Sequence, residues 1–188
     1  MPTDPRWVNI AEKNIQEILT DHAYCEQKAA STAISLIITY PEHTGLVKKM
    51  TELAMEEMSH FKMVHEKLIE RGMKLGRERK DEYVNKIMNF FAKTSDRNQR
   101  LINRLLVAAL IEARSCERFK LLSENIKDSD LAKFYNKLMV SEASHYIMFL
   151  QLARRFGEKK EVNKLWSSLL NFEAIVISNL GIKERIHG

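Results

Sequence analysis

Two short segments of the chain each place a glutamate three residues before a histidine. In EMSH, Glu57 precedes His60, and in EASH, Glu142 precedes His145. Because residues three apart share one face of an α-helix, each segment would present a carboxylate beside an imidazole. The apolar residues on the same faces are Leu53, Phe61, Val64 and Leu68 in the first segment and Leu138, Phe149 and Leu152 in the second. A carboxylate that faces the core in this way is costly unless it is paired or binds a metal ion.

A glutamate on an apolar stripe also precedes each of these segments. Glu26 and Glu112 are 86 residues apart, while the two glutamates of the short segments, and likewise their two histidines, are 85 residues apart. This nearly constant offset indicates that the two halves of the chain carry one duplicated pattern of site residues, although little else in them matches. His22, one turn before Glu26, is expected to be a packed or supporting histidine rather than a further ligand.

The chemistry that suits this set of side chains is metal binding. Four glutamates in one helical bundle would repel one another or take up protons unless cations were present, and two divalent ions would balance them. One glutamate from each of two helices, with Glu-x-x-His from each of two others, is the ligand set of ferritin-like di-iron and di-manganese proteins. Carboxylate and imidazole without cysteine favour iron or manganese over zinc or an iron–sulfur cluster. The predicted metal ligands are Glu26, Glu57, His60, Glu112, Glu142 and His145.

One of these ligands has an alternative. Glu117 follows Cys116 just as Glu26 follows Cys25, so aligning the two Cys-Glu pairs would select Glu117. The offset of the duplicated pattern instead favours Glu112, from which Glu117 lies about 140° away around a helix. We therefore prefer Glu112 as the ligand and keep Glu117 as the alternative.

The elements that would carry these residues are helices. Apolar residues recur at three- and four-residue spacing and hardly alternate, which predicts an all-α protein. The predicted helical ranges are 5–40, 44–71, 81–93, 97–125, 129–156 and 159–179. The residues that mark the expected starts, breaks and stops are Pro5 after Asp4, Thr20 with Asp21, Gly72, Ser95 or Asp96, and Gly181. Four long helices in two hairpins, with shorter ones added, predict a ferritin-like four-helix bundle with a crossover between the hairpins.

Composition places the chain in a broad class. With 188 residues and 45% apolar side chains, we expect a single ferritin-like domain over residues 1–188. Two cysteines are too few for a disulfide framework, no apolar run reaches the length of a membrane span, and the start MPTDPRW lacks a signal-peptide pattern. We therefore expect a soluble cytoplasmic protein with no membrane partner.

The net charge of +5 is concentrated in two segments. Residues 71–80 contain five basic side chains against one acidic, and residues 153–164 contain five against two. Such clusters could bind phosphate groups of a nucleic acid. The alternative is that they are solvated loops and helix ends, and the charge pattern alone favours that alternative.

The segments that hold the predicted ligands also resemble a known family. DHAYCEQKAASTA (21–33), EEMSHF (56–61), IEARSCERF (111–119) and SEASHY (141–146), together with the closing GIKERIHG, are similar to the tRNA 2-methylthio-isopentenyladenosine hydroxylases, the MiaE family. The resemblance covers nearly the whole chain. It implies a ferritin-like fold, a centre of two iron ions held by the six residues above, and dioxygen as co-substrate.

The resemblance further implies what the protein acts on. The expected reaction is hydroxylation of the isopentenyl group on a modified adenosine next to the tRNA anticodon, with electrons from an external donor. The expected partner is therefore tRNA that carries prenylated adenosine, and not DNA. The rival functions that would use the same ligands are a di-metal peroxidase or catalase and an iron store. A helical protein that only binds RNA would need no buried set of glutamates and histidines.

Overall fold

The computed structural model describes residues 2–79, 82–180 and 185–187, which form seven α-helices and no strand. The helices are α1 (Trp7–Lys13), α2 (Ile15–Thr39), α3 (Thr44–Glu70), α4 (Glu82–Met88), α5 (Arg97–Asn125), α6 (Ser129–Phe156) and α7 (Lys159–Leu180). The all-α prediction is confirmed. The described residues fall into two compact units, 13–79 with 185–186 and 2–12 with 82–180 and 187. A single domain over residues 1–188 stays a prediction.

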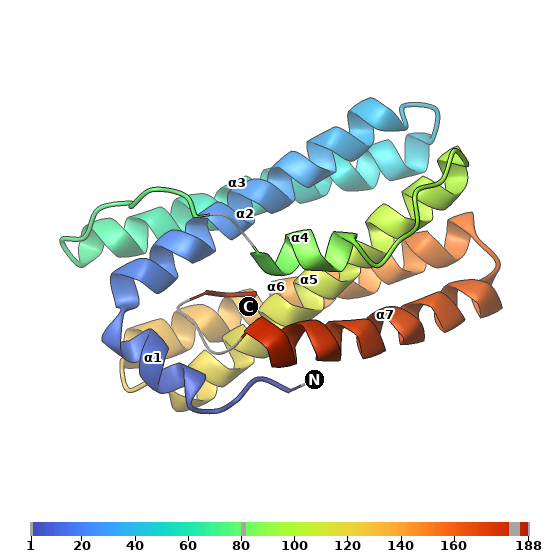
Figure 1. Ribbon diagram of the computed structural model, residues 1–188. Helices are drawn as coiled ribbons and strands as arrows, with labels where there is room; N and C mark the ends of the chain where they lie inside the picture. Colours follow the sequence, from blue (N-terminus) through green and yellow to red (C-terminus); the bar gives the residue numbers. More distant parts are fainter. Residues whose placement is uncertain (1, 80–81, 181–184, 188) are drawn as a thin grey trace. The chain divides into compact units, whose positions relative to one another are not determined.

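In the first of these units, α2 and α3 form an antiparallel hairpin around the turn at residues 40–43 (Figure 1). The buried residues of α3 recur every three or four positions, as an amphipathic helix requires. Its members are Leu46, Met50, Leu53, Glu57, His60, Val64 and Leu68. Phe61, which we expected on this face, is only half-buried. The predicted ligands of α3 therefore lie in the middle of its buried stripe.

The end of α3 matches the prediction closely. Gly72 has a φ of +66°, in the left-handed region that a glycine adopts without strain. The backbone N–H of Met73 then donates to the carbonyl oxygen of Leu68 at 2.9 Å, which closes the helix. Beyond this stop the chain contacts α2 again, where the side-chain amide of Gln16 donates to the carbonyl oxygen of Lys74 at 3.1 Å.

The break that we predicted near Thr20 and Asp21 is wrong. The helix is interrupted at Asn14 instead, between α1 and α2. Thr20 Oγ1 accepts a hydrogen bond from the backbone N–H of Gly76 at 3.2 Å, and Asp21 Oδ2 accepts one from Ile186 at 2.8 Å. These polar side chains bond to segments distant in sequence rather than to their own backbone, so they do not interrupt the helix.

The second unit is built on the α5–α6 hairpin. An aspartate begins each of its helices. Asp96 Oδ1 accepts hydrogen bonds from the backbone N–H groups of Asn98 and Gln99 at 2.8 and 3.1 Å. Asp128 accepts two in the same way at the start of α6. Both aspartates satisfy N–H groups that a helix start would otherwise leave unbonded, and of the two residues proposed for the α5 cap, Asp96 is the one used.

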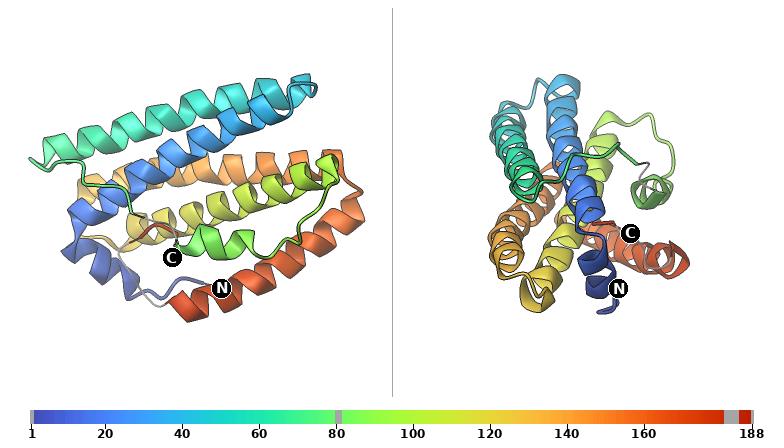
Figure 2. Two further views of the ribbon diagram at one scale, coloured as in Figure 1. Left: turned by 45° about the horizontal axis from the view of Figure 1, so that its top comes forward. Right: turned by 90° about the vertical axis from the view of Figure 1, so that its left-hand side faces the viewer.

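The other helices of this unit lie against the hairpin (Figure 2). After Gly157, α7 turns back and packs against α6 and α5, and α4 contacts α7 and α5. Helix α4 ends at Met88, earlier than predicted, and Phe90 beyond it packs on Phe172 with ring centroids 5.3 Å apart. Gly181, the predicted stop of the last helix, lies outside the described residues. Among the described helices, none is long and apolar enough to cross a membrane.

Candidate metal centre

The α2–α3 hairpin brings together three of the predicted ligands, Glu26, Glu57 and His60. One ligand atom of each lies within 4.8 Å of those of the other two. His60 Nδ1 is 3.1 Å from Glu57 Oε2 and 3.8 Å from Glu26 Oε2. All three side chains are buried. Two helices thus supply a compact group of two carboxylates and one imidazole.

His22, one turn before Glu26 on α2, contacts this group through the Glu26 carboxylate. Its Nε2 lies 2.6 Å from Oε1 of Glu26, and its ring is fully buried. An ionised carboxylate can only accept, so the N–H of the imidazole donates. This contact fixes one oxygen of Glu26 and leaves the other, Oε2, on the side of His60. The position agrees with the supporting histidine expected from the sequence.

The charges of this group stabilise one another. Burial alone would raise the pKa of Glu26, but the hydrogen bond from His22 and the nearby imidazole of His60 hold that pKa well below its usual range. Burial alone would lower the pKa of His60, but the hydrogen bond to Glu57 and the nearby carboxylate of Glu26 outweigh this and raise the pKa to about 10. A cation on the imidazole therefore balances the buried carboxylates. A divalent metal ion could replace the imidazole proton as the positive partner.

The α5–α6 hairpin brings together the other three predicted ligands, Glu112, Glu142 and His145. One ligand atom of each lies within 4.8 Å of those of the other two, and all three side chains are buried. Buried apolar residues continue the α6 stripe on both sides, with Leu138 before the pair and Phe149 after it. The duplicated sequence pattern therefore corresponds to two groups of the same composition, one in each hairpin.

Small side chains lie one turn away from the glutamate on the first helix of each hairpin. The residues one turn away are Ala23 and Ala30 around Glu26, and Ala108 and Ser115 around Glu112, and all four are buried. Protein interiors are packed tightly, so a larger residue at any of these positions would fill the space next to the carboxylate. The donor types, their burial and the small size of these four neighbours fit a metal ion in each group.

Glu117, the alternative ligand on α5, belongs to a different cluster. Its two carboxylate oxygens accept hydrogen bonds from the backbone and the hydroxyl of Thr3, at 2.6 and 2.9 Å, and it also pairs with Arg114. Glu112, by contrast, lies with Glu142 and His145. The geometry thus favours Glu112, as the sequence offset did.

The cluster around Arg114 was missed in the sequence. Arg114 pairs with Glu173 of α7, and the Tyr83 hydroxyl of α4 donates to the same carboxylate at 3.3 Å. Arg118, one turn along α5, lies over the ring of Trp7 with 4.2 Å between the guanidinium carbon and the ring centroid. All of these side chains are buried. In the sequence, the only sign of this cluster is a pair of arginines four residues apart on an otherwise apolar stripe. In the structure, the contacts of the cluster connect α4 and α7 to α5.

The two basic segments differ in how far their charges are neutralised. In residues 71–80, Arg79 lies 3.3 Å from Glu17 and 3.8 Å from Asp21, and Lys80 is outside the described residues. In residues 153–164, four cations are exposed and have no ion-pair partner among the described residues. They are Arg155, Lys159, Lys160 and Lys164. In the first segment Lys74 and Arg77 are likewise exposed without such a partner, so the second segment has two more exposed cations, but it also holds the exposed Glu158 and Glu161.

Helical hairpins that bury glutamates together with Glu-x-x-His pairs define the ferritin-like carboxylate proteins. The family described as tRNA-(MS[2]IO[6]A)-hydroxylase (MiaE) matches residues 1–188, the whole chain. The chain belongs to this family. Membership confirms the predicted class of activity, a tRNA-modifying hydroxylase.

Curated relatives and a solved structure agree with this assignment. A Pseudomonas putida protein named tRNA 2-(methylsulfanyl)-N(6)-isopentenyladenosine(37) hydroxylase is 37% identical over 161 residues, which cover 86% of this chain and 77% of that protein. A Salmonella typhimurium protein of the same name is 30% identical over 205 residues, covering 83% and 75%. The structure described as Protein 43 with aldehyde deformylating oxygenase activity from Synechococcus has a TM-score of 0.92 and 31% identity, over 100% of this chain and 94% of that one. The ferritin-like fold class is therefore confirmed.

Proposed function

We propose that this protein hydroxylates the isopentenyl group of N6-isopentenyladenosine, with or without the 2-methylthio group, next to the anticodon of tRNA. Family membership over the whole chain and the names of two relatives support this substrate. The observation in the chain itself that carries the proposal is the pair of buried groups, each with two glutamates and one histidine.

The proposed cofactor is a pair of iron ions. When bound, such a pair supplies the activation of dioxygen that hydroxylation of an unactivated carbon requires. The carboxylates and imidazoles are donors that iron accepts, and four carboxylates would balance two divalent ions. His22 would orient Glu26 through its N–H, and the apolar stripes around both groups would keep bulk water away. The proposed ligands are Glu26, Glu57, His60, Glu112, Glu142 and His145.

The balance of the reaction requires a further partner. One atom of dioxygen replaces a C–H bond of the prenyl group by C–OH, and the other atom leaves as water. This takes two electrons and two protons beyond what the substrate provides. An external electron donor is therefore part of the proposal.

The decisive experiment uses reduced, iron-loaded protein, tRNA that bears isopentenyladenosine, and isotopically labelled dioxygen. Mass spectrometry of the digested tRNA should show the hydroxylated nucleoside with one labelled oxygen atom. Oxygen derived from water would contradict the proposed chemistry. No nucleoside conversion, together with rapid consumption of hydrogen peroxide or bulk storage of iron, would favour a peroxidase, catalase or storage function.

A second candidate is the removal of the formyl group from an aldehyde. The likeness to the Synechococcus structure favours it, because that protein is described with aldehyde deformylating oxygenase activity. The same reduced protein should then be offered a long-chain aldehyde in place of tRNA. Release of formate at a rate above that of nucleoside hydroxylation would make deformylation the better assignment.

A further inference from the structure

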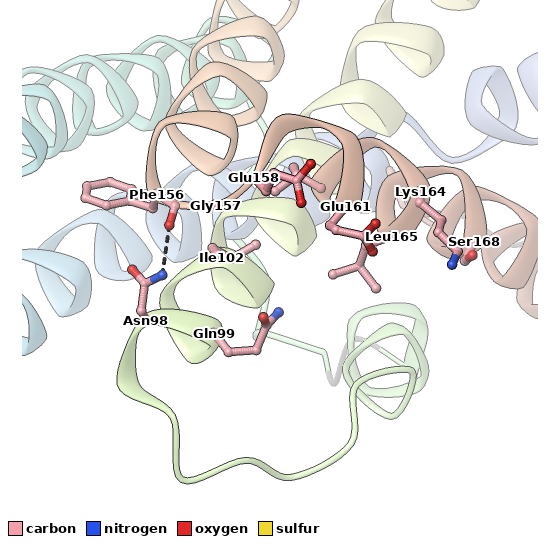
Figure 3. A pocket seen from close by; sticks show the side chains of 11 residues that line it. Asn98, Gln99, Ile102, Phe156, Gly157, Glu158, Glu161, Lys164, Leu165 and Ser168 are labelled. Atoms are coloured by element: carbon pink, nitrogen blue, oxygen red, sulfur yellow. Dashed lines mark hydrogen bonds between the residues drawn. The ribbon is translucent and has the colours of Figure 1, made fainter.

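A pocket that none of the proposed ligands lines opens at the α6–α7 turn. Its volume is about 600 Å³, and its walls come from the first turns of α5 and from the start of α7 (Figure 3). Ile102, Val162 and Leu165 provide apolar lining, while Gln99, Glu161 and Lys164 add polar groups. A concave site that combines apolar lining with polar groups can receive a small organic ligand or a part of a larger one.

The turn that shapes this pocket is fixed by close contacts. The Asn98 side-chain amide donates to the carbonyl oxygen of Phe156 at 2.8 Å, which ties the end of α6 to the first turn of α5 (Figure 3). At Gly157 a Cβ atom would lie 2.8 Å from both Ile102 Cδ1 and Val162 Cγ2, so any larger residue would force these side chains to shift. The pocket is thus held in shape before a ligand arrives.

The polar groups of the pocket favour a ligand that presents N–H donors. The Gln99 amide nitrogen donates to Asn103 at 2.8 Å, and its carbonyl oxygen makes no hydrogen bond to the described residues. The Glu161 carboxylate likewise has no partner among the described residues. Amide and carboxylate oxygens are the groups that accept from the amino groups on base edges. A flat base with an exocyclic amino group would match both the lining and these acceptors.

The surroundings of the pocket favour phosphate. Lys164 lines it, and Lys159, Lys160 and Arg155 stand exposed on the same turn without ion-pair partners among the described residues. Two acidic side chains offset only part of this charge. Exposed cations beside a base-sized cavity are the arrangement by which proteins bind single-stranded nucleic acid.

The pocket also lies on the same helix as one of the proposed ligands. Ile102 is ten residues before Glu112 on α5, which is roughly 15 Å along the helix axis. A few nucleotides of an RNA loop span such a distance. We propose that this pocket receives an unstacked base of the anticodon loop of the tRNA substrate, and that the cations of the α6–α7 turn bind its phosphates. This inference rests on the proposed function.

The phosphate contacts are tested by the salt dependence of tRNA binding. A triple variant, Lys159→Ala, Lys160→Ala and Lys164→Ala, should flatten the plot of log affinity against log salt by about 2, since each single-stranded contact contributes about 0.7. The matched control removes three lysines at the opposite end of the same hairpin, Lys120→Ala, Lys127→Ala and Lys133→Ala. Its slope should stay within experimental error of the unmodified protein.

The base contact is tested by shortening two side chains that line the pocket. Gln99→Ala combined with Leu165→Ala should weaken tRNA binding about tenfold, the size expected for losing one base contact. The salt slope, the iron content and kcat at saturating tRNA should remain unchanged, while KM rises. Leu165→Met, which keeps the apolar lining, should retain most of the affinity. Circular dichroism checks that each variant is folded.

The unmodified protein separates the two possible failures. If it neither binds tRNA nor hydroxylates prenylated adenosine, the proposed function and this inference both fail. If it does both, but the lysine and pocket variants bind tRNA with unchanged affinity and salt slope, only the inference is overturned. An equal loss of tRNA affinity and salt slope in the control variant at the other end of the hairpin would also overturn the inference. The loss would then follow from the lower net charge of the protein and not from the position of the lysines.

Discussion

Thr3 holds Glu117 by both oxygens of its carboxylate. The backbone N–H of Thr3 donates to Oε1 at 2.6 Å, and its hydroxyl donates to Oε2 at 2.9 Å. Glu112, five residues earlier on α5, lies instead with Glu142 and His145. This relationship assigns different surroundings to two glutamates whose roles the sequence spacing left open.

Substitution of these two glutamates should therefore have different effects on metal content. Glu112→Ala should lower iron from about two ions per chain, the content that six ligands imply, because it removes one carboxylate of the α5–α6 group. It should also abolish hydroxylation. Glu117→Ala should leave the iron content close to that of the unmodified protein. Elemental analysis of protein purified from iron-supplemented cells measures both, and loss of iron from the Glu117 variant alone would show that the Cys-Glu alignment chose the right ligand.

The sequence predicts the long helices well because their determinants are local. The period of the apolar residues sets the faces of α3 and α6, and Asp96 and Asp128 cap the helices that follow them. The same period placed all six candidate ligands on buried faces. Features that depend on distant partners were not predictable in this way. The Thr20 hydroxyl accepts a hydrogen bond from the backbone N–H of Gly76, 56 residues away, and the expected helix break does not occur.

The buried charges of the second unit were hidden for the same reason. Arg114 and Glu173 are 59 residues apart, and no sequence pattern within either helix predicts that they form an ion pair. The interpretation of the two basic segments also needed the structure, since a sequence shows charges but not their partners. Only the positions of Glu17 and Asp21 reveal that Arg79 is neutralised.

Two glycines should resist substitution for different physical reasons. At Gly157 the new methyl group would press on Ile102 and Val162, so Gly157→Ala should lower the free energy of unfolding by about 1–3 kcal/mol through overpacking. Gly72 has open space around it but a φ of +66°. Gly72→Ala should cost about 1 kcal/mol through backbone strain alone. Denaturant unfolding monitored by circular dichroism gives both values.

A second substitution distinguishes these causes. Val162→Ala removes one of the two atoms that the methyl group would meet at Gly157, so Gly157→Ala should cost less in that background. The cost of Gly72→Ala should be the same with and without Val162→Ala. An equal cost of Gly157→Ala in both backgrounds would mean that crowding against Val162 is not what requires a glycine there.

The buried pair of Arg114 and Glu173 should matter more for stability when one partner is lost than when both are replaced. Glu173→Ala should lower the free energy of unfolding by about 3 kcal/mol, because it leaves a buried guanidinium with fewer partners. The double variant Arg114→Met with Glu173→Leu should recover much of that loss. Tyr83→Phe, which removes only the hydroxyl hydrogen bond at 3.3 Å, should cost about 1 kcal/mol. Additive losses in the double variant would contradict this account.

His22 should control how tightly iron is held without being a ligand. Its N–H fixes Oε1 of Glu26 at 2.6 Å, and groups that orient a ligand in this way typically contribute 10- to 100-fold to metal affinity. His22→Phe keeps most of the buried volume but removes the donor, so iron affinity measured by chelator competition should fall by about that factor. His22→Gln, which can still donate to the carboxylate, should retain more of the affinity. His65→Phe is the matched control, because His65 stacks on Phe61 and is only half-buried. An unchanged affinity in His22→Phe would show that Glu26 needs no such support, whereas complete loss of one iron would indicate that His22 is itself a ligand.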